Sequence, residues 1–386
     1  MHLFFSVGEP SGDEHASELI ATLRSRGPLR AVGFGGPLMQ AAGQEQAFAL
    51  CDLAVMGIQQ IAGQLKTFFR LADEAEHHFR TERPDAVVLV DYPGFNWHLA
   101  KRAKRLGIPV IYYMPPQLWA WAPWRIRKAR RLVDLVLSGL PFEADWYRDR
   151  GVSVAEVSHP FFDEVAKHPI DTDRVESIRS QGRPVAILPG SRNSELRNNF
   201  SIQLRAAQRL AAKHPDVHFS VAAYKRQHAD FCREAIAAKA PNLPVTVHQG
   251  CTSEIIEAAD AVLAVSGSVS LELLARRTPA SVQYRLPPAT GVAGHFLVRT
   301  PWVTLPNLIA QREVMPELNF IRRRERNARV IADPVDRWLS DPAAMDAKRA
   351  ELDAVARSVV KPGGTVAAAR AIEELLGLKS QRRMAA

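Results

Sequence analysis

Cysteine is scarce in this sequence. Only Cys51, Cys232 and Cys251 occur among the 386 residues, and they form no C-x-x-C pair. Disulfide frameworks and zinc knuckles need cysteines at close and regular spacing. The sequence therefore excludes both classes, and a reducing cytoplasm is the compartment that we expect.

Long apolar runs are missing too. No stretch approaches the roughly 18 consecutive apolar residues that span a bilayer, and the best runs are Ala86 to Val90 and Pro109 to Tyr113. The first residues, Leu3 to Val7, lack the basic start and the cleavage site of a secretory leader, and predict a strand. Any association with a membrane is therefore expected to be peripheral.

Several common site motifs are absent as well. The glycines of Gly33 to Gly36 lack the G-x-G-x-x-G spacing, and neither a Walker A sequence nor H-E-x-x-H occurs. The histidines are scattered, and the one D-x-D, Asp171 to Asp173, falls in a predicted linker. These absences argue against dehydrogenases, P-loop NTPases and zincins, and favour a mechanism without a metal ion or a cofactor.

The length and the charge are informative in their turn. A chain of 386 residues exceeds what one core usually holds, so we expect two domains with a cleft between them. The formal net charge of +9 favours a polyanionic partner. Nucleic acid, an anionic membrane face and a phosphorylated substrate all satisfy that condition.

Short apolar runs alternate with longer amphipathic stretches along the chain. This rhythm predicts an α/β fold in which helices cover parallel sheets. The runs are Leu3 to Val7, Ala86 to Val90, Pro109 to Tyr113, Val185 to Leu188, Val217 to Ala222 and Ala261 to Val265.

The polar stretch 166–183 separates the last strand of the first half from a new strand at Val185. It predicts an N-terminal domain over residues 1–165 and a second domain over residues 166–342. Two helical stretches follow within residues 343–386, separated by the helix-ending sequence Pro362 to Gly364. We expect these helices to brace the domains.

The first candidate site follows the first strand, at Gly8 to Asp13. Ser11 and Glu14 have the spacing of a capping box that would open a helix over Glu14 to Arg24. Free N–H groups at such a helix start suit an anion or a sugar hydroxyl, and Gly8 and Gly12 would let a ligand approach the backbone. A plain strand-to-helix turn is the alternative.

The second domain offers two similar turns. Gly190, Ser191 and Arg192 follow the strand Val185 to Leu188, and the arginine could pair with phosphate oxygens in a bidentate way. A solvated arginine in a first helical turn is the alternative.

The later turn holds small residues and bare amides, followed by a carboxylate one turn into a helix. By analogy with dinucleotide folds, that carboxylate could hold ribose hydroxyls; a favourable first-turn acid is the alternative. The residues concerned are Ser266, Gly267, Ser268 and Glu272.

Asp91 directly follows the most apolar run, Ala86 to Val90. Ligands bind at strand ends of open α/β sheets, and burial raises a carboxyl pKa toward neutral pH. Asp91 is therefore a candidate general base for a sugar hydroxyl. A simple turn or N-cap aspartate would look the same.

An aromatic cluster stands beside a basic stretch between residues 119 and 131. Aromatic and cationic side chains together suit an anionic lipid surface. Stacking on single-stranded nucleic acid and burial in the core are the alternatives. The residues proposed for membrane contact are Trp119, Trp121, Trp124, Arg125, Arg127 and Lys128.

Taken in order, these segments resemble the lipid-A-disaccharide synthases of glycosyltransferase family 19. In the first half the matching segments are Gly8 to Asp13, Leu53 to Ile58, Asp91 to Asn96, Pro116 to Trp121 and Leu140 to Glu143. In the second half they are Leu188 to Arg192, Ser266 to Glu272, Tyr284 to Arg285, Thr304 to Leu308, Arg312 to Glu313 and Glu317 to Leu318.

The resemblance implies a GT-B fold, with two Rossmann-like, doubly wound domains facing a cleft. It further implies an inverting, metal-independent transfer from UDP-2,3-diacylglucosamine to 2,3-diacylglucosamine 1-phosphate, which yields a β-1,6-linked disaccharide phosphate and UDP. Enzymes of this family are peripheral on the inner face of the cytoplasmic membrane. A homodimer with exchanged C-terminal helices stays open.

The same resemblance assigns roles to residues. Asp91 matches the proposed base, and Glu9 and Ser11 match the N-terminal active-site loop. Positions tied to donor binding or activity are Arg192, Asn307, Arg312 and Glu313.

Four positions depart from the family pattern. Gly94 replaces an aspartate, Ser158 and Gln311 replace glycines, and Ser268 replaces a threonine. Because Gly94 lies three residues from Asp91, a GT-B relative with another acceptor is an alternative. A non-catalytic protein that binds UDP-sugars or anionic lipids is another, and a nucleic-acid binder is disfavoured because the charge is spread along the chain.

Overall fold

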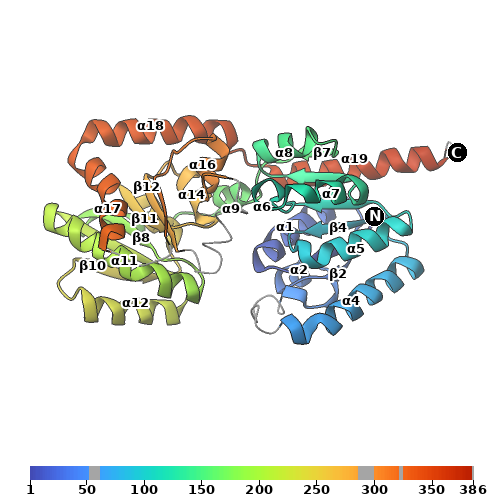
Figure 1. The fold of residues 1–386 in the computed structure, drawn as a ribbon, viewed down its shortest axis with the longest axis horizontal. Helices are drawn as coiled ribbons and strands as arrows, with labels where there is room; N and C mark the ends of the chain where they lie inside the picture. Colours follow the sequence, from blue (N-terminus) through green and yellow to red (C-terminus); the bar gives the residue numbers. More distant parts are fainter. Residues whose placement is uncertain (52–60, 286–299, 321–324, 385–386) are drawn as a thin grey trace. The chain divides into compact units, whose positions relative to one another are not determined.

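A computed structural model describes residues 1–51, 61–285, 300–320 and 325–384. The contacts divide the chain into two compact units (Figure 1). Unit 1 contains Met1–Asp163 and Lys361–Ala386, and unit 2 contains Glu164–Val360. The matching segment Leu53 to Ile58 lies outside the described residues.

Unit 1 is built on a seven-stranded parallel sheet of order β3-β2-β1-β4-β5-β6-β7. Its strands are β1 (His2–Val7), β2 (Arg30–Phe34), β3 (Glu45–Phe48), β4 (Ala86–Val90), β5 (Val110–Tyr113), β6 (Leu135–Ser138) and β7 (Val154–Glu156). The strand order reverses between β1 and β4, which pair in parallel with Phe5 opposite Val88. Ligands bind at such switch points, outside the carboxyl ends of the strands.

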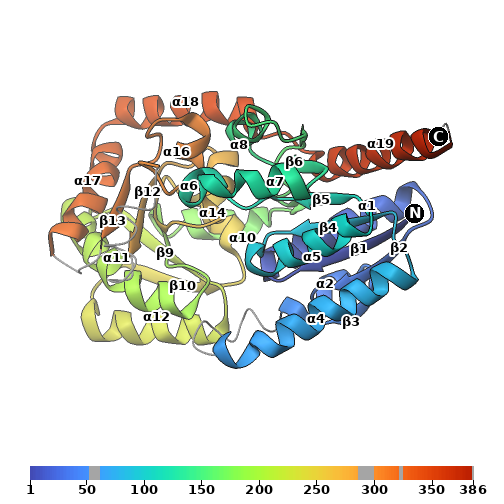
Figure 2. The ribbon, with the colours of Figure 1, turned by 45° about the vertical axis from the view of Figure 1, so that its right-hand side comes forward.

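Helices cover both faces of this sheet. On one face α4 (Ile61–Thr81) and α5 (Pro93–Arg105) lie side by side (Figure 2), together with α7 (Ile126–Leu132). On the other face α1 (Pro10–Arg26) packs against the C-terminal helix α19 (Gly364–Met384). Both faces of β4 are therefore buried, and its five residues are all apolar.

The remaining helices of unit 1 are short. They are α2 (Pro37–Ala41), α6 (Leu118–Trp121), the 3-10 turn η2 (Pro123–Arg125), α8 (Pro141–Arg148) and α9 (Phe161–Lys167), which runs across the boundary with unit 2. Asp163 in α9 accepts hydrogen bonds from the backbone N–H groups of Gly363 and Thr365, the latter at 2.9 Å. This carboxylate thereby caps the start of α19.

Unit 2 contains a six-stranded parallel sheet of order β10-β9-β8-β11-β12-β13. Its strands are β8 (Arg183–Leu188), β9 (Val217–Ala223), β10 (Val245–Gln249), β11 (Ala261–Val265), β12 (Ala280–Arg285) and β13 (Glu317–Phe320). The order reverses between β8 and β11, which are paired directly. The turns after these two strands are therefore the switch-point turns of unit 2.

The helices of unit 2 follow its strands. They are α10 (Thr172–Arg179), α11 (Asn193–Lys213), α12 (Arg226–Lys239), α13 (Thr252–Ala258), α14 (Val269–Ala275), α16 (Leu305–Ala310), α17 (Glu325–Ser340) and α18 (Pro342–Val359). Packing of α11 and α17 over β8 and β11 forms the main core, with Phe200 and Trp338 buried in it.

The α/β class and the six apolar runs predicted as strands are confirmed. The linker expected at 166–183 instead contains the end of α9 and all of α10, whose N-cap is Asp171. The C-terminal segment 343–386 is divided, because α18 groups with unit 2 and α19 with unit 1. Within the described ranges, no helix combines the length and the apolar character that crossing a membrane requires.

Candidate active site

Asp91 and Tyr92 follow β4 with an unusual backbone. Both have positive φ angles, 44° and 45°, although neither is a glycine. Each such residue costs roughly 1–3 kcal/mol and needs support from its surroundings. Two strained residues in succession at a switch point therefore mark this turn as a functional candidate.

Asn96 supplies much of that support. It is fully buried, and its Nδ2 donates to the backbone oxygens of Asp91 at 2.8 Å and Val90 at 3.1 Å. Its Oδ1 accepts from Ser6 Oγ at 2.7 Å, and Tyr112 OH donates to the Asp91 oxygen at 2.6 Å. The main chain of Asp91 is thus held from α5, β1 and β5.

The Asp91 carboxyl is electrostatically perturbed. Its pKa is raised to about 7, mainly by burial and also by the charge of Glu9, while His15 opposes the shift. This is the direction that its place at a strand end led us to expect. A carboxyl with this pKa is divided between its acid and base forms at neutral pH, as a general base requires.

The loop after β1 differs in detail from the sequence-based expectation. Helix α1 begins at Pro10 with Glu9 as its N-cap, four residues earlier than predicted, and no side chain caps it. The predicted capping box of Ser11 and Glu14 is therefore wrong, because the proline at the first helical position favours a helix start at Pro10. Ser11 is exposed in the first turn.

The two glycines of this loop serve packing within the protein. A Cβ atom on Gly8 would lie 2.4 Å from the ring of Tyr92, and one on Gly12 would lie 2.8 Å from Val7 Cγ1. Only glycine allows these contacts. The loop is consequently packed tightly against the Asp91 turn. The groups that approach these two glycines closely are Tyr92 and Val7, where a ligand had been expected.

Two histidines and one glutamate near this site were not assigned any role from the sequence. His15 and His159 meet edge to face with ring centroids 5.6 Å apart, and burial lowers the pKa of His159 to about 3. His159 Nδ1 accepts from Phe161 N at 3.2 Å, so its other ring nitrogen carries the proton.

Glu143 is the third such residue. It is buried after β6, where Trp119 Nε1 donates to its Oε1 at 2.9 Å and Ser138 Oγ to its Oε2 at 2.8 Å. Burial raises its pKa to about 7, although both hydrogen bonds oppose that shift. Its segment, Leu140 to Glu143, was recognised as a family match without a role.

The aromatic cluster is split between core and surface. Trp119 is only partly exposed, because its indole N–H is bound to Glu143 and its ring packs on Phe142 at 4.9 Å. Trp124 is 60% exposed, and Arg127 and Lys128 are exposed beside it. Arg125 is partly buried, and the side chain of Trp121 lies outside the described atoms.

In unit 2, Glu195 of the following helix α11 binds the backbone of the turn after β8. Gly190 has a φ of 103°, and a Cβ atom there would lie 2.7 Å from Glu195. Glu195 Oε2 accepts from the N–H groups of Ser191 at 3.2 Å and Arg192 at 3.3 Å, the amides expected to face a phosphate. The Arg192 side chain is 73% exposed and touches Glu195 Oε1 at 3.2 Å. The guanidinium is thus the freer anion-binding group of this turn.

The turn after β11 is more open. Gly267 and Ser268 are exposed, and no atom of the described residues lies within 4 Å of where a Cβ on Gly267 would be. Ser266 N donates to Gln283 O at 3.1 Å, which ties the turn to β12. As far as the described residues show, the turn is therefore open beside the start of α14.

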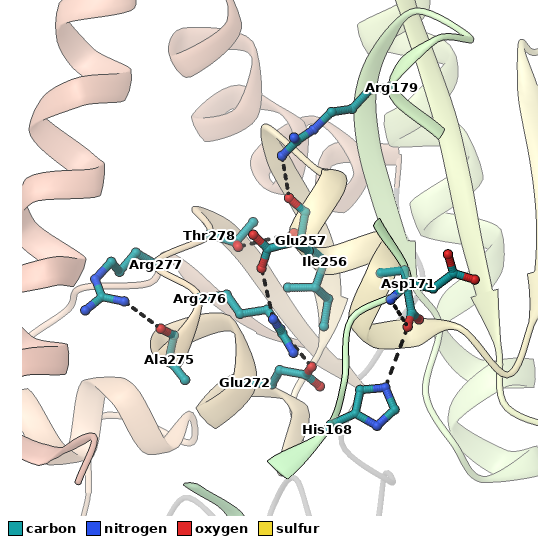
Figure 3. A network of polar contacts seen from close by, with 11 residues as sticks. His168, Asp171, Arg179, Ile256, Glu257, Glu272, Ala275, Arg276, Arg277 and Thr278 are labelled. Atoms are coloured by element: carbon teal, nitrogen blue, oxygen red, sulfur yellow. Dashed lines mark hydrogen bonds and ion pairs between the residues drawn. The ribbon is translucent and has the colours of Figure 1, made fainter. Parts of the chain in front are cut away.

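Glu272, one turn into α14, belongs to a charged network (Figure 3). Arg276 Nε donates to Glu272 Oε1 at 2.9 Å, and Arg276 Nη1 donates to Glu257 Oε2 at 2.9 Å. The side chains of Glu272 and Arg276 are 8% and 9% exposed. Glu272 is thus a fixed carboxylate near the open turn.

Three further predicted residues lie on or just after α16. Asn307 is fully buried and uses all its hydrogen-bonding groups, accepting from Val314 N and Met315 N and donating to Met315 O and Glu317 Oε2. It therefore shapes the loop rather than facing a ligand. Arg312 is exposed and paired with Glu351, and Glu313 is also exposed.

The two positions where the family pattern leads us to expect glycine, Ser158 and Gln311, have a left-handed backbone. Ser158 has a φ of 63° and Gln311 a φ of 52°, in the left-handed region that favours glycine. Ser158 Oγ donates to Lys361 O at 2.8 Å and so recovers part of the cost. Among the described residues, no group of three or more histidine, cysteine, aspartate or glutamate side chains is arranged to hold a metal ion.

Comparison with known proteins matches both units. The family model Lipid-A-disaccharide synthetase matches residues 3–332. A protein named lipid-A-disaccharide synthase from Anaeromyxobacter dehalogenans (strain 2CP-1) is 36% identical over 374 residues, covering 96% of each chain.

Solved structures share the fold. The UDP-GlcNAc 2-epimerase of Neisseria meningitidis, bound to UDP-GlcNAc, has a TM-score of 0.64 at 12% identity, covering 97% of this chain and 99% of that one. The calicheamicin glycosyltransferase CalG4 has a TM-score of 0.61 at 16% identity, covering 97% and 98%. These likenesses confirm the predicted GT-B fold of two parallel-sheet α/β domains.

Proposed function

This chain belongs to the lipid-A-disaccharide synthase family, the glycosyltransferases that act in lipid A biosynthesis, and we propose that it joins UDP-2,3-diacylglucosamine to 2,3-diacylglucosamine 1-phosphate. The products are the β-1,6-linked disaccharide 1-phosphate and UDP. The observation that carries this proposal is the Asp91 turn: a strained backbone at the switch point of unit 1 and a carboxyl with a pKa of about 7.

In the proposed reaction Asp91 is the general base. Its carboxylate takes the proton of the acceptor 6-hydroxyl while that oxygen attacks the anomeric carbon of the donor. The bond from the anomeric carbon to the UDP oxygen breaks, and the configuration is inverted because attack comes from the opposite side. One displacement suffices, so no covalent intermediate with the protein forms.

Glu9 acts on this base through its charge. Its carboxylate raises the pKa of Asp91, and it lies in the loop that packs against the Asp91 turn through Gly8 and Tyr92. Ser11 and Gly12 follow in the first turn of α1. We assign Glu9 to tuning the base and the exposed Ser11 hydroxyl to contact with the acceptor.

Unit 2 supplies the proposed donor site. Charge that develops on the departing UDP is met by the exposed guanidinium of Arg192 and by the open turn Ser266 to Ser268. Because Glu195 already occupies the amides of Ser191 and Arg192, that helix start contributes less than its sequence suggests. Donor recognition is consistent with the fold shared with a UDP-GlcNAc-bound epimerase.

The test is a direct transfer assay. Purified protein is incubated with both acylated substrates in EDTA, and the disaccharide 1-phosphate is followed by mass spectrometry for wild type and Asp91→Asn. Product from the wild type but not from the variant supports the proposal. UDP-sugar binding without product favours a different acceptor or a non-catalytic binding protein.

We also propose that unit 1 contacts the anionic inner face of the cytoplasmic membrane. The packed helices α5 and α7 carry exposed cations beside the exposed Trp124, and such a combination attracts anionic headgroups. The cations are Lys101, Arg105, Arg127, Lys128 and Arg131. Sedimentation with vesicles tests this: binding should need anionic lipid, weaken with salt and fall when Arg127 and Lys128 are replaced by glutamine.

A further inference from the structure

Arg276 is a nearly buried cation that the proposed reaction leaves unused. It follows directly after α14, and its side chain is 9% exposed. Its guanidinium bridges Glu272, on its own helix, to Glu257 of α13 (Figure 3). A buried arginine is costly unless it is paired, so both carboxylates help to keep it in place.

The far anchor of this bridge is itself fixed. Arg179 of α10 donates to the backbone oxygen of Glu257 at 2.8 Å and to that of Ala258 at 3.4 Å. Thr278 Oγ1 donates to Ile256 O at 3.3 Å from the segment after Arg276. Helix α13 is therefore held from two sides, and Glu257 presents a fixed carboxylate to Arg276.

The near end is bound by one oxygen only. Arg276 Nε contacts Glu272 Oε1, whereas Nη2, on the same edge of the guanidinium, has no hydrogen-bond partner among residues 1–51, 61–285, 300–320 and 325–384. The pair is therefore not the closed two-bond clasp that arginine and a carboxylate often form. Within the described part of the chain, no group donates to Glu272 Oε2. Oε1 of Glu272 is therefore paired with Arg276, whereas Oε2 is available as a hydrogen-bond acceptor.

We propose that Arg276 is a positioning residue that holds Glu272 for the ribose 2′-hydroxyl of the nucleotide donor, and that it thereby sets a preference for ribo- over deoxyribonucleotides. This rests on the proposed use of a UDP-sugar. A carboxylate that is kept ionised and fixed in direction accepts strong, charge-assisted hydrogen bonds from neighbouring hydroxyls. Without the 2′-hydroxyl one such bond is lost, and a polar site built for it rejects the analogue.

Arginine suits this task better than lysine would. The planar guanidinium directs separate N–H groups toward Glu272 and Glu257 at once, whereas an ammonium is a single point of charge. The next residue, Arg277, provides a matched comparison, because it pairs with Asp353 at 2.5 Å on the surface and is 47% exposed.

The test compares binding of UDP and 2′-deoxy-UDP by calorimetry. Wild type should bind UDP at least 10-fold more tightly. In Arg276→Met the UDP affinity should fall about 10-fold while the 2′-deoxy-UDP affinity stays within about twofold, so that the preference collapses. Arg277→Met should keep the wild-type preference. Unchanged 2′-deoxy-UDP binding shows that the rest of the site is intact, which general misfolding would not preserve.

Glu257→Gln is a second variant that keeps the inference testable if Arg276→Met fails to fold. It removes the charge of the partly exposed anchor, 42% exposed, and leaves Glu272 and Arg276 in place; the preference should fall part of the way. A wild-type preference retained in Arg276→Met or Glu257→Gln overturns the inference. Equal binding of both nucleotides by wild type also overturns the inference, but it leaves the proposed donor site intact. No binding of UDP at all overturns the proposed function as well.

Discussion

Replacing Asp91 by asparagine should inactivate the protein and make it more stable at the same time. Asparagine keeps the shape of the side chain and tolerates the left-handed backbone at this position better than alanine does. It removes the ionisable group and with it the cost of burying a charge. Loss of a general base lowers turnover by roughly 10²- to 10⁴-fold.

The stability gain depends on pH in a defined way. Burial raises the pKa of Asp91 from 3.8 to about 7, so between these values the folded protein binds a proton that the unfolded chain has released. Stability of the wild type therefore falls as the pH rises through this window, and the penalty is complete above it. At 1.36 kcal/mol per unit, the full penalty is about 4 kcal/mol as an upper bound.

Thermal unfolding of wild type and Asp91→Asn between pH 4 and pH 8.5 measures this effect. The two midpoints should nearly coincide at the acid end and separate by up to about 10 °C at the alkaline end, for a unit of this size. The exposed Asp149→Asn is the control and should track the wild type throughout. A separation that does not change with pH would refute the link between burial and the raised pKa, and retained turnover would refute Asp91 as the base.

Three other changes follow from the same geometry. Asn96→Ala should lower kcat at least 10-fold and leave the KM for the UDP-sugar within about twofold, because it frees the Asp91 turn without touching unit 2; equal effects on both constants would contradict this. Gln311→Gly should be about 1 kcal/mol more stable than Gln311→Ala in urea unfolding, because only glycine adopts its φ of 52° without strain; equal stabilities would show that the turn relaxes. Gly94→Asp should raise the free energy of unfolding by roughly 0.5–1 kcal/mol, since it replaces a glycine in the first turn of α5 where no atom of the described residues lies within 4 Å of the new Cβ; a lower unfolding midpoint would contradict that.

The strands were predictable because their signal is local. The runs at β1, β4, β8 and β11 are apolar on both faces, and only a parallel sheet covered on both sides buries such segments. The position of Asp91 followed for the same reason, since it is the first polar residue after β4.

The sequence-based predictions were wrong where two local signals competed, and they were incomplete where a property depends on residues that are distant in the sequence. At the start of α1, Ser11 and Glu14 have the spacing of a capping box, but the helix begins earlier, at Pro10. Helix α10 was missed because its surroundings are polar, although Val175 and Ile178 bury one face. Burial raises the pKa of Glu143, and hydrogen bonds from Trp119 and Ser138, which are 24 and 5 residues away, oppose that shift. No local sequence pattern shows that these three residues meet.

Three of the four expected departures from the family pattern separate into two physical kinds, and nothing in the structure explains the fourth, Ser268. Ser158 and Gln311 occupy left-handed backbone that glycine adopts freely, so their cost lies in strain, which Ser158 offsets through its bond to Lys361. Neither change alters a group expected to touch a sugar. Gly94 is different, because the family pattern leads us to expect a carboxylate there, three residues from the proposed base, and among the described residues nothing lies within 4 Å of where its Cβ would be. If acceptor choice has shifted in this chain, the Asp91 turn is therefore where we expect the shift, whereas Ser268 is a separate change in the proposed donor turn.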